Sequence, residues 1–167
     1  MGIYDYRWCL FRSIVKLIHC ILLASILLIG LLYHAQLIET NTQLDFRYER
    51  SSLISHEYWR LITAHFIHLN LFHTLMNLVA FALLTFTFWH NIYGKFDAFN
   101  YILCIISIDL GLFILQPELT NYVGFSGILH GLFAYYFIKT LTKKNIVAQI
   151  GIVAVIAKIL WEQSPWV

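Results

Sequence analysis

Charged residues are scarce in this sequence. They make up 12% of its 167 residues, whereas 60% of the residues are hydrophobic. Soluble globular domains carry roughly 25% charged residues, so a chain of this size could not cover itself in water with so little charge. The net charge of +2 is equally small, and no basic stretch is long enough to bind nucleic acid. We therefore expect the lipid bilayer to be the solvent for most of the surface, with no nucleic-acid partner.

Cysteine is scarce as well. There are three, at Cys9, Cys20 and Cys104. Their number is odd, their spacing is not that of metal ligands, and each lies in or beside an apolar run, which favours reduced, structural thiols. A zinc site made of His65, His68 and His73 is the alternative, but on one helix the step from His68 to His73 turns by about 140°, so the three rings would not converge. We expect no metal and no cofactor.

The first apolar run lacks the features of a signal peptide. It extends from about Ile14 to Tyr33, longer than the roughly 7–15 apolar residues of such a peptide, and no A-x-A cleavage site follows. Four further runs approach the roughly 17–25 residues that a spanning helix needs, and none shows the alternation of barrel strands. We predict one all-α membrane domain over residues 1–167, a polytopic helical bundle whose five transmembrane helices span about 14–33, 69–89, 99–115, 123–141 and 146–161.

Two basic clusters predict the orientation of this bundle. They flank apolar runs and consist of Arg7, Arg12 and Lys16, and of Lys139, Lys143 and Lys144. Lysine and arginine accumulate in cytoplasmic loops. We therefore expect a cytoplasmic amino terminus, an external first loop over residues 34–60, and an external carboxyl terminus after five spans.

Polar side chains gather at the start of the second predicted span. His73 and Asn77 are four residues apart and share a helical face, within a run that is otherwise apolar. Polar groups inside a membrane are expensive, so this pair is a candidate functional site. The alternative, which also applies to His65 and His68 near the interface, is a structural role in hydrogen bonds between helices.

A serine between glycines opens the fourth predicted span, in the sequence Gly124-Phe125-Ser126-Gly127. The glycines allow other backbone to approach the Ser126 hydroxyl, and Gly127 with Gly131 forms a G-x-x-x-G surface for close helix packing. Packing alone is the alternative explanation. Because Ser126, His73 and Asn77 all lie in the outer half of the predicted bundle, they can meet at one depth. A serine nucleophile needs a base, and its oxyanion needs donors such as these imidazole and amide groups.

These motifs resemble a known family. The stretch from Trp59 to Asn77 resembles the second-helix signature of rhomboid intramembrane serine proteases, and residues 124–127 resemble their nucleophile motif. Residues 117–119, 122–131 and 158–163 are more narrowly similar to the rhombosortase branch, so the similarity covers about 57–163. The resemblance implies that Ser126 is the nucleophile, that His73 and Asn77 stabilise the oxyanion, and that His68 has a supporting role.

The same resemblance implies a substrate and a location. Rhombosortases are thought to cleave a carboxyl-terminal sorting tag, a Gly-Gly motif followed by one span and a basic end, from exported bacterial proteins. The expected partner is thus a membrane-anchored protein with a single-span tail, in the bacterial inner membrane. The oligomeric state stays open.

One departure from the family concerns the base. Rhomboids take it from a histidine in a sixth span, whereas no histidine follows His130 in this sequence. His130, four residues after Ser126, is a weak alternative base. We expect a domain truncated at its carboxyl end, with the Gly127/Gly131 face lacking its partner helix.

Two alternatives to an active protease remain. One is an inactive pseudoprotease that still binds transmembrane substrates. The other is a small membrane carrier that uses Asp109 and Lys158, although we expect these two to form a structural ion pair.

Overall fold

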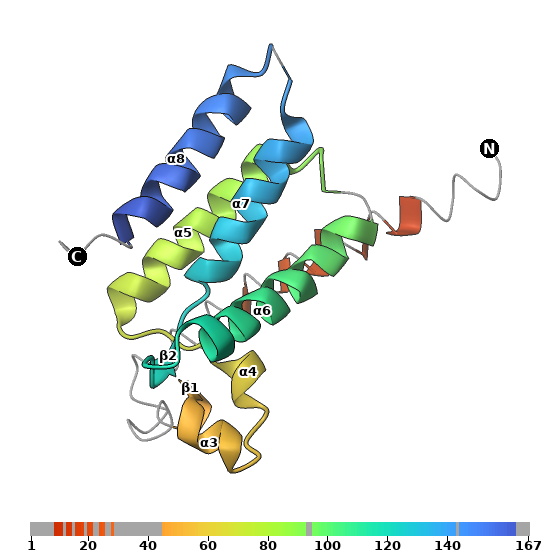
Figure 1. Ribbon diagram of the computed structural model, residues 1–167. Coiled ribbons are helices and arrows are strands. Elements are labelled where there is room, and N and C mark those ends of the chain that lie inside the picture. The colour runs from red at the N-terminus through yellow and green to blue at the C-terminus, as the bar shows by residue number, and fades with distance from the viewer. Residues whose placement is uncertain are drawn as a thin grey trace.

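The protein is a bundle of helices arranged around one central helix (Figure 1). A computed structural model describes residues 45–92, 95–142 and 144–162, together with helical positions scattered between residues 9 and 28. The main helices are α5 (Leu71–Phe88), α6 (Lys95–Leu115), α7 (Ser126–Thr140) and α8 (Ile146–Glu162). Helix α7 packs against each of the other three. Its first residue, Ser126, is half-buried.

Aromatic side chains fill the contact between α5 and α7. Phe88 stacks on Tyr136 with ring centroids 5.1 Å apart, and Phe81 meets Phe125 edge to face at 5.7 Å. All four rings are at most 4% exposed. Such pairs stabilise a core beyond the area they bury, so the depth of α5 relative to α7 is fixed at both ends of the contact.

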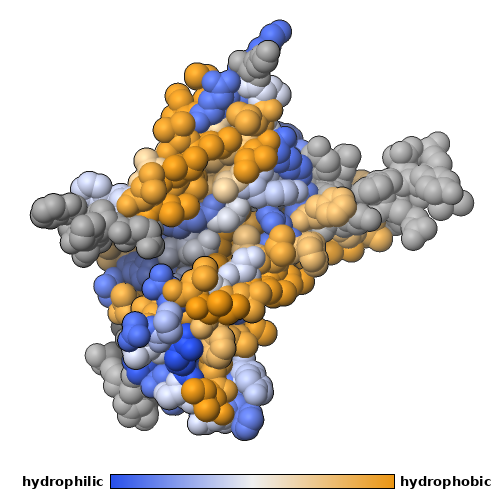
Figure 2. All heavy atoms as spheres, viewed as in Figure 1, coloured by the Kyte–Doolittle hydropathy of each residue, from blue (hydrophilic) through white to orange (hydrophobic). Residues whose placement is uncertain are grey.

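The outer surface of the helices is apolar. On α5, Phe86 is 85% exposed, and large apolar side chains also face outward along α6 and α8. Figure 2 shows this apolar surface over the helices, with hydrophilic residues gathered near the cap at one end. An exposed apolar surface of this extent is that of a protein whose surroundings are lipid.

The helical fold class predicted from the sequence is confirmed. Helices α5 to α8 coincide with four predicted spans, whereas the first predicted span, 14–33, falls mostly outside the described residues. Within the described part of the chain, α5 alone combines the length and composition needed to cross a membrane, and two apolar stretches, Phe99–Leu115 and Ile146–Trp161, are shorter. The number of crossings stays a prediction.

A small structured cap covers one end of the bundle, where the sequence predicted only an external loop. It consists of β1 (Tyr48–Glu49), α3 (Arg50–Ile54), α4 (Arg60–Thr63) and β2 (Asn121–Tyr122). The two strands pair antiparallel, with Tyr48 opposite Tyr122 and Glu49 opposite Asn121. This short sheet is an exception to the all-α prediction, and it joins the segment before α5 to the loop before α7.

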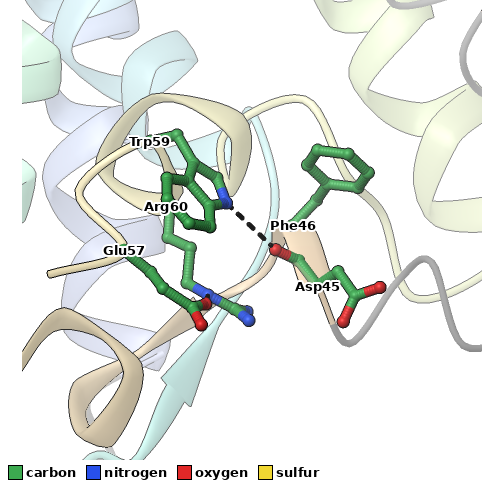
Figure 3. A pocket seen from close by; sticks show the side chains of 5 residues that line it. All are labelled: Asp45, Phe46, Glu57, Trp59 and Arg60. Carbon is green, nitrogen blue, oxygen red and sulfur yellow. Dashed lines mark hydrogen bonds and ion pairs between the residues drawn. The ribbon is translucent and has the colours of Figure 1, made fainter. Parts of the chain in front are cut away.

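Arginine side chains hold the cap together. Arg60 is only 5% exposed; its Nε donates to the carboxylate of Glu57, and its Nη1 donates to the backbone oxygen of Arg47 over 3.0 Å. The indole of Trp59 donates to the backbone oxygen of Asp45 over 3.4 Å, across a cavity of about 390 Å³ (Figure 3). Because the Arg60 charge is paired and hydrogen-bonded, its burial is tolerated.

A second arginine fastens the cap to α6. The Nη2 of Arg50 donates to the backbone oxygens of Leu112 and Phe113, over 3.2 and 2.6 Å. These carbonyls belong to the last turn of α6, where no intrahelical donor is left for them. A cation at that end also complements the helix dipole. Arg50 therefore stabilises the helix end and the cap position together.

Candidate active site

Gly124 brings the side chains of His73 and Ser126 together. Its backbone φ of +122° is a value that residues other than glycine rarely adopt. A β-carbon at this position would lie 2.9 Å from Cε1 and 3.3 Å from Nε2 of His73, and 3.8 Å from Oγ of Ser126. The imidazole from α5 and the hydroxyl from α7 thus flank the same bare backbone atom, so the glycine is required by both conformation and space.

Hydrogen bonds fix both sides of the Gly124 peptide. Its N–H donates to the backbone oxygen of Ala64 over 2.9 Å, and its carbonyl accepts from the Tyr122 hydroxyl over 3.0 Å. Ala64 directly follows α4, and Tyr122 is in β2. The cap therefore holds the loop that leads into Ser126. Neither partner was identified as a site residue from the sequence, although Tyr122 lies within the matched motif.

The N-cap and the second turn of α5 each supply a polar group. Asn70 caps the helix, accepting from the backbone N–H of His73 over 2.9 Å. The Asn77 side chain is 3% exposed, and its amide donates to the His73 carbonyl over 2.9 Å. An amide NH₂ carries two donors, so Asn77 has a second N–H besides the one in this bond.

His68 lies against His73. Their rings meet edge to face with centroids 5.1 Å apart, and His68 is 4% exposed. The prediction that His68 and His73 lie on one helix is wrong, since α5 begins at Leu71 after the Asn70 cap. The chain before that cap turns His68 back onto His73. No three His, Cys, Asp or Glu side chains gather as metal ligands among the described residues.

His130 bonds to the backbone of Ser126. Its Nδ1 lies 2.8 Å from the Ser126 carbonyl oxygen, and because a carbonyl can only accept, this nitrogen carries the proton. In the part of the chain that is described, the Ser126 hydroxyl itself has no hydrogen-bond partner. His130 thus braces the first turn of α7 rather than contacting the hydroxyl.

The Gly127/Gly131 face is occupied by α6, and the prediction that it lacks a partner helix is wrong. A β-carbon on Gly127 would lie 2.9 Å from Cδ1 of Ile108 and 3.0 Å from the Tyr122 hydroxyl. One on Gly131 would lie 2.6 Å from Sγ of Cys104. Helix α6 packs closely against the two glycines of α7, and its side chain nearest Gly131 is the small Cys104.

The predicted ion pair of Asp109 with Lys158 is not found among the described residues, and Asp109 lies beside a histidine instead. Asp109 Oδ1 lies 3.3 Å from Nε2 of His65, a residue with 0% exposure. The His65 ring also meets the Tyr122 ring edge to face, with centroids 5.8 Å apart. Both His65 and Asp109 were noted in the sequence, but their pairing was not predicted. It depends on the cap, which turns His65 toward α6.

A half-buried serine at a helix amino terminus lies near the imidazole of His73, and the buried amide of Asn77 is bonded to the backbone of that histidine. These are the groups that a serine hydrolase within a membrane would use. The chain matches the Rhomboid domain family over residues 55–163, most of its length, and it belongs to that family. Rhomboid proteins are integral membrane serine proteases. No curated protein matches the sequence.

Proposed function

We propose that this protein is a rhombosortase-type intramembrane serine endopeptidase. Its substrate would be an exported protein that ends in a Gly-Gly motif, one membrane span and a basic tail. The family match and the rhombosortase-like motifs around Ser126 support this proposal. The single observation that carries it is the convergence of His73 and Ser126 on Gly124.

The proposed reaction is acyl transfer through Ser126. Its Oγ attacks the scissile carbonyl, and the developing oxyanion is stabilised by the His73 imidazole, the Asn77 amide and the Ser126 backbone N–H. This N–H belongs to the first turn of α7, whose donors have no intrahelical partner and whose dipole favours negative charge. Collapse of the intermediate breaks the scissile C–N bond, and the carboxyl-side fragment leaves as an amine that takes up the proton from Ser126. Water then hydrolyses the acyl ester and frees the Ser126 hydroxyl.

Activation of the Ser126 hydroxyl requires a base within hydrogen-bond reach. His130 would serve only after its Nδ1 leaves the Ser126 carbonyl oxygen, or if its other nitrogen reached the hydroxyl. A histidine brought by a sixth span is the base that the family resemblance implies. In either case Ser126, His73 and Asn77 keep their roles.

The proposed location is the bacterial inner membrane, with a cytoplasmic amino terminus. Lys139 and Lys144 lie at the end of α7 opposite Ser126, which supports a cytoplasmic position for that end. Ser126 would then act from the outer half of the membrane on a tag that is already exported.

Reconstitution in lipid vesicles with a tagged, single-span substrate tests the proposal. We expect cleavage that Ser126→Ala abolishes and that Ser107→Ala, at an exposed serine of α6, leaves unchanged. His73→Ala and Asn77→Ala should each lower kcat about 10²–10³-fold, with little change in KM, because their donors act on charge that forms only in the transition state.

Other outcomes identify the alternatives. Substrate that binds without being cut, in the unchanged protein and the Ser126→Ala variant alike, would indicate a pseudoprotease. Cleavage that survives Ser126→Ala would contradict the proposed site. Transport that depends on Asp109 and not on Ser126 would indicate a carrier.

A further inference from the structure

A buried acid–histidine pair lies next to the serine loop and outside the proposed oxyanion site. It joins Asp109 of α6, over 3.3 Å, to the fully buried ring of His65, between α4 and α5. An ionised carboxylate only accepts, so Nε2 of His65 carries the proton of this bond. The second ring nitrogen, Nδ1, is buried without a hydrogen-bond partner among the described residues. Asp109 therefore fixes both the tautomer and the plane of the ring.

The oriented ring acts on Tyr122. It meets the tyrosine edge to face at 5.8 Å, a geometry that depends on the ring plane. The Tyr122 hydroxyl in turn donates to the Gly124 carbonyl, over 3.0 Å. On the other side of the same residue, the N–H of Gly124 donates to the backbone oxygen of Ala64, the residue directly before His65. His65 is thus connected to Gly124 through its own backbone neighbour and through Tyr122.

We propose that Asp109 and His65 are positioning residues for the nucleophile: through Tyr122 and Ala64 they hold the Gly124 peptide, and with it the Ser126 hydroxyl, against His73. This inference rests on the proposed protease function. Neither residue touches the reacting atoms. A displacement of about 1 Å at a reacting centre can lower the rate roughly 10²-fold, so a pair that fixes this loop affects kcat more than substrate affinity.

The kinetic test uses the full chain in lipid vesicles. Asp109→Asn is expected to lower kcat about 10–100-fold with KM within about twofold, and Asp109→Glu should restore much of the loss, since the carboxylate returns. Tyr122→Phe, which removes the hydroxyl bond to Gly124 and keeps the ring, should have a similar effect. The double variant should be little worse than either single one, because both act through one loop.

A buried acid elsewhere on the same helix provides the matched control. Asp97 of α6 is fully buried, whereas the Asp109 side chain is 14% exposed, and Asp97 pairs with Lys139 near the opposite end of the bundle. Asp97→Asn should therefore lower stability while leaving the kcat of the folded protein unchanged. Equal losses of kcat in Asp97→Asn and Asp109→Asn would show a general structural effect and overturn the proposal.

A measurement that needs no catalysis separates this inference from the proposed function. Amide hydrogen exchange over residues 120–127 should be faster in Asp109→Asn and in Tyr122→Phe than in the unchanged protein, with exchange in α8 unaltered. If the unchanged protein cleaves nothing, the proposed function fails, and faster exchange in this loop alone would still support the positioning role. Unchanged exchange over residues 120–127 overturns that role.

Discussion

Asp97 of α6 and Lys139 of α7 form an ion pair at the end of the bundle opposite Ser126. The carboxylate is fully buried, and the ammonium also donates to the backbone oxygen of Asn91 over 2.8 Å. Three segments are thus joined by one lysine: the end of α7, the start of α6 and the turn after α5. Asp97 also lies in the first turn of α6, where the helix dipole favours a negative charge.

The first prediction concerns this pair. Asp97→Asn should lower the free energy of unfolding by about 3 kcal/mol, because removing one partner of a buried pair leaves the other charge uncompensated. Thermal unfolding in lipid–detergent micelles measures the change. Adding Lys139→Met should recover part of the loss. Equal stability of the unchanged protein and Asp97→Asn would contradict a structural role for the pair.

The second prediction concerns Gly124. Gly124→Ala should reduce cleavage at least about 100-fold, since the new methyl group displaces the His73 ring and the backbone conformation is strained by about 1–3 kcal/mol. Gly111→Ala is the control, because a β-carbon there meets no atom within 4 Å. That change should stabilise α6 by about 0.5–1 kcal/mol and leave activity unaltered. Full activity in Gly124→Ala would exclude the proposed His73–Ser126 geometry.

The third prediction tests the occupant of the glycine face. Gly131→Ala should destabilise the bundle by about 1–3 kcal/mol, because its methyl group would overlap the Cys104 sulfur. The Cys104→Ala/Gly131→Ala double variant should recover most of this loss, and the non-additivity identifies the contact. A neutral Gly131→Ala, measured by thermal unfolding, would mean that the face is open.

The fourth prediction compares two arginines of the cap. Arg50→Gln should lower stability by about 1–2 kcal/mol, since charged donors are lost from the last carbonyls of α6. Arg47→Gln should change it by less than about 1 kcal/mol, because the Arg47–Glu49 ion pair is partly exposed to solvent. Similar losses in both variants would show that the α6 contact contributes nothing specific.

Hydropathy was sufficient to locate four helices, and its errors have a physical cause. Helix α6 begins at Lys95 rather than at the predicted residue 99, and its first turn contains Asp97, a charged residue outside the apolar run. Its charge is neutralised by Lys139, which lies far along the chain and cannot be paired with it by inspection. The cap between residues 45 and 63 was missed for a similar reason, since its order comes from hydrogen bonds to distant segments.

Motifs in the sequence identified the residues of the candidate site, but not the residues that contact them in space. The spacing of His73 and Asn77 and the glycines around Ser126 were enough to propose a meeting point. A G-x-x-x-G pair, however, indicates close approach without naming the approaching helix, so Gly127 and Gly131 were assigned to a helix not in the sequence. The pairing of Asp109 depended likewise on the turn that carries His65.

The backbone hydrogen bond between Gly124 and Ala64 has a consequence for when, during synthesis, Ser126 becomes reactive. The two positions are separated by the whole of α5 and α6, so both helices must be in place before the bond can form. Until then the Ala64 carbonyl cannot hold the loop before Ser126, with its positive φ at Gly124, in place. We therefore expect the nucleophile to mature after insertion, and a serine-reactive probe to label ribosome-bound chains only once residues beyond α7 have emerged. Before residues beyond α7 emerge, the incomplete chain would therefore not cleave membrane proteins inserted nearby.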